Sequence, residues 1–129
     1  MTNKNKLMRV LVANQPKLMR EVILAMFADQ PDMEIVGEVS DETQIAGCVN
    51  QTSPDLLVIA LDGSGRRPLI CDTILAAHPE VLIIAVSSGQ DWSVCYSASV
   101  QIQSNNIEPT EAGILNAARK KAVAAGGWM

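Results

Sequence analysis

The stretch PDLLVIALDG, Pro54 to Gly63, contains the clearest strand signal in the chain. Its apolar run ends at Leu61, and Asp62 and Gly63 follow as a turn. A continuous apolar run of this kind is typical of a strand covered on both faces, as in a parallel sheet. Because α/β proteins gather ligands just beyond such strands, Asp62 either has a chemical role or lies beside a place where a reactive group is missing.

Further runs along the chain extend this signal to a whole domain. The sequence predicts strands at Met8–Ala13, Glu34–Val39, Asp55–Leu61 and Val81–Ser87, and a weaker edge strand at Ser99–Gln103. Helical patterns fill the gaps at Pro16–Ala28, Asp41–Asn50 and Leu69–Ala77, and a last helix starts near Pro109 and stops at Gly126 and Gly127. Strands alternating with helices of this length predict a doubly wound parallel sheet with right-handed crossovers.

Composition and charge narrow the class of protein. The chain has 129 residues, of which 48% are apolar and 19% charged, and this profile predicts one globular domain. A net charge of −4 argues against binding to nucleic acid or an anionic membrane. No stretch reaches the roughly 18 apolar residues of a membrane span, and the N-terminus lacks a signal-peptide core. We therefore expect a cytoplasmic protein.

The cysteines, Cys48, Cys71 and Cys95, are widely spaced and form no CxxC or Cys/His cluster. An odd, scattered set is typical of reduced thiols rather than of a disulfide framework or a zinc site. The sequence therefore predicts neither a metal nor a cofactor.

Five segments, taken in order, resemble a response-regulator receiver domain, and most closely the receivers of regulators that carry a helix-turn-helix DNA-binding domain. The segments are MRVLVANQPKLMREVI, QPDMEIVGEVSD, PDLLVIALDG, AAHPEVLIIAVSS and ARKKAVAAGG. The resemblance implies a flavodoxin-like or CheY-like (βα)5 three-layer sandwich, with a parallel five-stranded sheet of order 2-1-3-4-5. It assigns residues 1–127 to a receiver-like domain and residues 128–129 to a tail or the start of a linker.

The resemblance also implies a chemical site, which this sequence largely lacks. In receivers an acidic pair and an aspartate hold Mg²⁺, that aspartate accepts the phosphoryl group, and a hydroxyl and a lysine bind its oxygens. The acidic pair corresponds to Ala13 and Asn14, the acceptor to Ala60 and the lysine to Asn105. Only Ser87, at the hydroxyl position, keeps the family chemistry. The resemblance therefore implies a degenerate pocket without phosphorylation.

Asp62 lies two residues beyond the missing acceptor. If the strand continued, Ala60 and Asp62 would lie on the same side, so Asp62 is a candidate surrogate acceptor. The turn that begins here and the loss of the lysine favour an ordinary solvated turn aspartate instead.

The segment after Ser87 departs from the family as well. It reaches Asn105 with about four residues fewer than usual, roughly one helical turn, so we expect a shortened helix 4. On that helix Trp92 and Tyr96 are spaced i, i+4 and would share a face. They would either anchor a partner or pack beneath the helix. The aromatic switch position of receivers corresponds to Ile102, which has no hydroxyl.

The sequence thus predicts a degenerate receiver domain of two-component (phosphorelay) signal transduction that acts through protein–protein interaction, with a signalling protein or a second copy as partner. One alternative is a small-ligand-binding module, in which the emptied pocket near Ser87 and Arg66 takes a metabolite. Another is the regulatory front half of a DNA-binding transcriptional regulator. We do not expect an enzyme, because no nucleophile and base are paired in the sequence.

Overall fold

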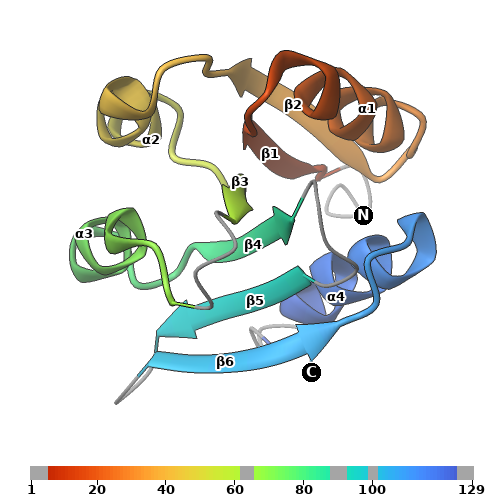
Figure 1. The fold of residues 1–129 in the computed structure, drawn as a ribbon. Helices are drawn as coiled ribbons and strands as arrows, with labels where there is room; N and C mark the ends of the chain where they lie inside the picture. The colour runs from red at the N-terminus through yellow and green to blue at the C-terminus, as the bar shows by residue number, and fades with distance from the viewer. Residues whose placement is uncertain (1–5, 62–65, 88–92, 99–101, 125–129) are drawn as a thin grey trace.

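A six-stranded sheet of order β2-β1-β3-β4-β5-β6 forms the centre of the computed structural model, which describes residues 6–61, 66–87, 93–98 and 102–124 (Figure 1). The strands are β1 (Met8–Ala13), β2 (Met33–Glu38), β3 (Leu56–Leu61), β4 (Leu82–Ser87), β5 (Ser93–Ala98) and β6 (Ile102–Ile107). The helices are α1 (Lys17–Ala28), α2 (Ile45–Thr52), α3 (Leu69–Ala77) and α4 (Glu111–Ala124), and a 3-10 turn, η2 (Glu42–Gln44), precedes α2.

The first four strands are parallel, as their apolar runs predict. Strand β1 lies between β2 and β3, and β4 pairs with the other side of β3. All residues of β4 and nearly all of β3 are buried, because helices cover both faces of this part of the sheet. The order β2-β1-β3-β4 is the one expected for the doubly wound fold.

Two hydrophobic cores lie on opposite faces of the sheet. On one face α2 and α3 pack against alternate strand residues such as Leu57 and Ile83, and on the other α1 and α4 pack against neighbours such as Val58 and Ile84. Figure 1 shows this division, with α2 and α3 to the left of the sheet and α1 and α4 to the right. The result is the expected three-layer sandwich.

The structure corrects the expected arrangement after β4. Residues 93–98, assigned to a shortened helix, form strand β5, and the edge strand expected at residues 99–103 is instead β6. Strand β5 runs antiparallel to β4, and β6 runs antiparallel to β5, so the sheet is not a five-stranded parallel one. The alternation of Val94 and Tyr96 with more polar neighbours has the period of a strand. Both side chains are buried beside α3, which stabilises the strand over a helix.

Polar contacts fix the start of the α2 region and the position of α4. Asp41 begins the α2 region as predicted, and its Oδ1 accepts bonds from the backbone N and the Oγ1 of Thr43 at 3.0 and 2.9 Å. On α4, Arg119 donates to both carboxylate oxygens of Asp32, at 2.8 and 3.0 Å. The bidentate contact ties α4 to the start of β2. Within the described ranges no helix has the length and apolar content needed to cross a bilayer.

Candidate functional site

The carboxyl edge of the parallel strands brings together three of the positions singled out in the sequence. Ala13 ends β1 and pairs with Ile59, Ala60 pairs with Val86, and Ser87 ends β4. Ala13 and Ser87 are almost fully buried, and Ala60 is partly exposed. The strand ends therefore meet where a receiver holds its phosphorylation site, but with two methyl groups and one hydroxyl.

Asn14, the fourth position, is completely buried directly after β1. Its Nδ2 donates to the main-chain oxygen of Ile59 over 2.8 Å, and no described residue bonds to its Oδ1. The amide therefore cross-links β1 to β3 beside Ala60. A carboxylate at position 14 could not donate this bond, so the exchange of an acid for an amide has a structural effect as well as an electrostatic one.

Arg20 also lies at this edge, although the sequence patterns did not single it out as a site residue. It lies on α1 with only 8% of its side chain exposed; its Nε donates to Glu38 Oε2 at 2.8 Å, and its Nη1 to the Asn14 main-chain oxygen at 3.2 Å. A signal was present, because Arg20 shares the inward face of α1 with Ile23 and Phe27. A charged residue at a core-facing position indicates a specific buried partner.

A small cavity remains beside the missing acceptor. It measures about 120 Å³ and is lined by Ala13, Ala60, Ile45, Ile70 and Glu42, among others. Ligand pockets usually exceed about 300 Å³. In the parts of the chain that the structure describes, no three histidine, cysteine or acidic side chains are grouped so that they could hold a metal ion.

Asn105, expected at this edge, lies elsewhere. It pairs with Cys95 on β5, and Cys95 pairs with Ile84 on β4, three residues before Ser87. At about 3.3 Å per residue, Ile84 lies about 10 Å from the carboxyl end of β4. Asn105 lies level with Ile84 and is two strands away from it. The match of Asn105 to the receiver lysine is therefore wrong. In this chain β5 and β6 form an antiparallel pair where a receiver has a helix and one strand.

Of the two aromatic residues expected at an interface, Trp92 and Tyr96, only Tyr96 lies in the described part of the chain. Tyr96 is 5% exposed and packs with the core beside α3, so it is a core residue and not an exposed anchor. Burial raises the pKa of its phenol above the usual value. Trp92 and Asp62 lie outside the described residues, and Ile102 begins β6.

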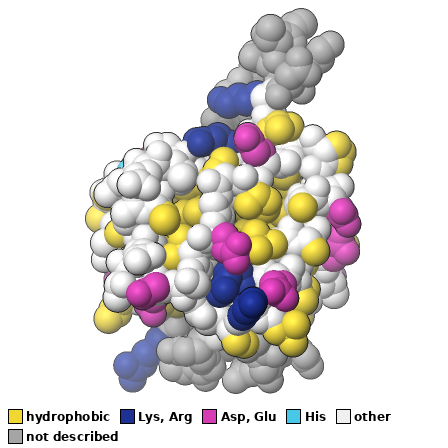
Figure 2. All heavy atoms as spheres, turned by 90° about the horizontal axis from the view of Figure 1, so that it is seen from above, with side chains coloured by type: hydrophobic (Ala, Val, Ile, Leu, Met, Phe, Trp, Pro, Cys, Tyr) yellow, Lys and Arg dark blue, Asp and Glu magenta, His cyan; other side chains and the backbone are white. Residues whose placement is uncertain are grey.

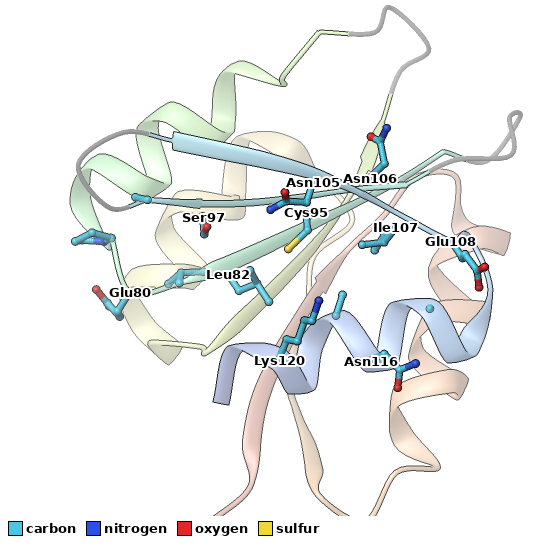
Figure 3. A pocket seen from close by; sticks show the side chains of 15 residues that line it. Glu80, Leu82, Cys95, Ser97, Asn105, Asn106, Ile107, Glu108, Asn116 and Lys120 are labelled. Carbon is cyan, nitrogen blue, oxygen red and sulfur yellow. The ribbon is translucent and has the colours of Figure 1, made fainter. Parts of the chain in front are cut away.

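A second, larger hollow lies on the other face of the sheet, between β5, β6 and α4 (Figure 3). This groove measures about 800 Å³ and combines apolar side chains with amides and charges. Its lining includes Leu82, Cys95, Asn105, Ile107, Asn116 and Lys120. Burial raises the pKa of the Cys95 thiol to about 11, so the thiol is protonated at neutral pH.

Comparison with known proteins supplies the fold's identity. No protein-family model matches the chain, and a search of curated proteins finds no match. Among solved structures, the chain is similar to the response regulator domain of Thermotoga maritima CheB, with a TM-score of 0.54 and 24% identity. The similarity covers 64% of this chain and 62% of that one, which is less than two thirds of the compared domain. The comparison therefore shows a flavodoxin-like, CheY-like α/β fold over the matched part of the chain.

Proposed function

We propose that the chain is a receiver-like module of two-component signalling that accepts no phosphoryl group and acts through protein–protein contact. The observation that carries this proposal is that Ala60, with only a methyl side chain, occupies the acceptor position at the end of β3, beside the end of β4. A methyl group has no nucleophilic atom to accept a phosphoryl group.

The electrostatics of the edge support the same conclusion. Phosphoryl transfer in a receiver needs a divalent cation held by carboxylates. Here the main-chain oxygen of Asn14 accepts a bond from Arg20, and the acidic-pair positions, 13 and 14, carry no charge. The nearby carboxylate of Glu38 is already paired with the Arg20 guanidinium at 2.8 Å, which makes it a weaker ligand for Mg²⁺.

The surface is consistent with a protein partner. Leu18 and Val22 lie one turn apart on α1 with 72% and 52% of their areas exposed, and Leu69 on α3 is 82% exposed. On the face shown in Figure 2, acidic and basic side chains are intermixed with apolar ones rather than gathered by sign. Such a surface fits a protein better than nucleic acid or an anionic membrane.

The small-ligand alternative has less support. The cavity beside Ala60 holds about 120 Å³, the volume of a few water molecules, and neither Ser87 nor Arg66 lines it. A role as the front half of a DNA-binding regulator is compatible with the proposed mechanism, because contact with a partner can replace phosphorylation as the input.

Incubation with acetyl phosphate and Mg²⁺, followed by intact-mass measurement, tests the proposal. We expect a single unmodified mass at all donor concentrations. A phosphoryl adduct mapped by peptide analysis to Asp62 would show that a surrogate acceptor exists. An adduct on a serine, threonine or lysine that also forms on urea-unfolded protein is chemical acylation or phosphorylation of an exposed side chain and leaves the proposal standing.

A further inference from the structure

The two edges of the sheet differ in how far they are protected against pairing with another strand. Edge strands in monomeric proteins usually carry charges, proline or irregularities that prevent addition of a further strand. Strand β2 has such features, because it carries Glu34 and Glu38 and its register with β1 shifts between Val10 and Leu11. This edge is built to stay unpaired.

Strand β6, at the opposite edge, has none of these features. Its sequence, IQSNNI, contains no charged residue and no proline, and its six residues pair with β5 in unbroken register from Ile102 to Ile107. Within the described part of the chain β6 pairs only with β5, and Figure 1 shows it as the last strand on its side. Alternate residues of β6 therefore direct their backbone N–H and C=O groups away from the sheet.

The exposed side chains of β6 are suited to a second copy of the same strand. Ser104, Asn105 and Asn106 are all exposed. Serine and asparagine both donate and accept hydrogen bonds, so a run of them is complementary to itself when two copies meet in opposite directions. Antiparallel pairing of identical edges is also closed by a twofold axis, so it ends at a dimer instead of growing into a fibre.

The groove beneath the same edge adds apolar surface to this region. Ile107 of β6 and Leu82 of β4 contribute to its lining, together with Asn116 and Lys120 of α4 (Figure 3). A strand added to β6 would lie along the border of this groove and reduce its exposure to water. Apolar surface next to an unpaired strand favours association over a monomer with a bare edge.

We infer that β6 is a homodimerisation edge, at which the β6 strands of two copies pair antiparallel and extend the sheet across a twofold axis. The inference deepens the proposed function by naming a second copy as a partner. A contact of one strand per copy, with part of the groove, is at the small end of specific interfaces, so we expect a dissociation constant of about 1–100 µM.

The test uses the full chain and sedimentation velocity between about 1 µM and 1 mM, a range that brackets this dissociation constant. The wild-type chain should shift from 13.8 kDa to twice that mass as its concentration rises. The Ser104→Lys/Asn106→Lys variant adds two positive charges to β6 of each copy. It should raise the dissociation constant of the dimer at least about tenfold, because like charges then face each other across the twofold axis. The matched control, Gln44→Lys/Gln51→Lys, adds the same charge at exposed sites near and on α2 and should dimerise as the wild type does.

Hydrogen exchange of the wild-type chain distinguishes the strand from other dimer surfaces. Amides of β6 should gain protection with rising protein concentration, while those of the edge strand β2 should not. A wild-type monomer at all concentrations, dimerisation undiminished in the lysine variant, or concentration-dependent protection that leaves the β6 amides unchanged would each overturn the inference. The same runs with acetyl phosphate keep the two proposals apart: a dimer that needs the donor contradicts the proposed function, whereas a monomer in both conditions contradicts only the role of β6.

Discussion

Arg20 donates through its guanidinium to the main-chain oxygen of Asn14 over 3.2 Å, at the edge where the parallel strands β1, β3 and β4 end. Both residues are buried, and Glu38 accepts a second bond from the same guanidinium. The edge thus holds an arginine–glutamate ion pair that is also bonded to the backbone of Asn14. The contact connects Asn14, which follows β1, to the packing of α1 on the sheet.

Restoring only the acceptor should not restore phosphorylation. We expect Ala60→Asp to remain unmodified by acetyl phosphate and Mg²⁺, because Ala13 and Asn14 supply no carboxylate to hold the cation. Ala60→Asp/Asn105→Lys should behave in the same way, since Asn105 lies level with the middle of β4 and not at its end. Intact-mass measurement checks both variants, with Ala60→Asn as the uncharged control. A phosphoryl adduct that forms only in the double variant would contradict the placement of Asn105.

Removing the buried guanidinium should destabilise the domain. Arg20→Ala leaves the Asn14 oxygen without its donor, and we expect a loss of about 1–3 kcal/mol in the free energy of unfolding. Glu38→Gln retains an oxygen that can accept from Arg20, and Glu38 is itself half exposed, so the cost of this change should stay below about 1 kcal/mol. Urea unfolding of the two variants at neutral pH gives both values. Equal, small losses would show that the buried contact contributes little.

Two helical glycines should respond to alanine in opposite directions. A Cβ on Gly47 in α2 meets nothing within 4 Å, so Gly47→Ala should stabilise the chain by about 0.5–1 kcal/mol through helix propensity. A Cβ on Gly113 in α4 would lie 2.4 Å from the main-chain oxygen of Glu108. Gly113→Ala should therefore destabilise the chain by about 1–3 kcal/mol.

Thermal and urea unfolding of the two glycine variants measure the difference. Stabilisation by Gly113→Ala would mean that the turn between β6 and α4 relaxes at little cost, and it would remove the close approach as the reason for glycine at this position.

The contact between Asp32 and Arg119 should make the free energy of unfolding depend on pH in the acidic range. The hydrogen bond from Arg119 holds the pKa of Asp32 below its usual value. A carboxylate with a lowered pKa in the folded state stabilises that state above its unfolded pKa of about 3.9 and loses this contribution as the pH falls through its folded pKa. Because both side chains are about half exposed, the contribution should be about 1 kcal/mol or less.

Asp32→Asn should accordingly lower the free energy of unfolding near neutral pH and make little difference at about pH 2, where the wild-type carboxylate is also protonated. Urea unfolding at several pH values compares the two chains. A difference that stays constant down to the lowest pH would point to the neutral hydrogen bonds of the site instead of the charge.

The amino-acid sequence by itself determined the parallel half of the fold and the residue types at the ends of its strands. The apolar runs that end at Ala13, Leu61 and Ser87 are long enough to be read as buried strands without knowledge of their neighbours. The order of the five segments then identified Ala60 as the informative position of the stretch PDLLVIALDG.

Only the tertiary structure decided the region after β4 and the charge at the carboxyl edge. Residues 93–98 are short and weakly patterned, so their pairing with β4 and their burial against α3 select a strand over a helix. As a strand, this segment runs antiparallel to β4, and β6 follows it at the edge of the sheet. Asn105 therefore lies on β6, away from the carboxyl ends of the parallel strands. The role of Arg20 likewise depends on the packing of α1, because its partners Asn14 and Glu38 come together only when the helix lies on the sheet.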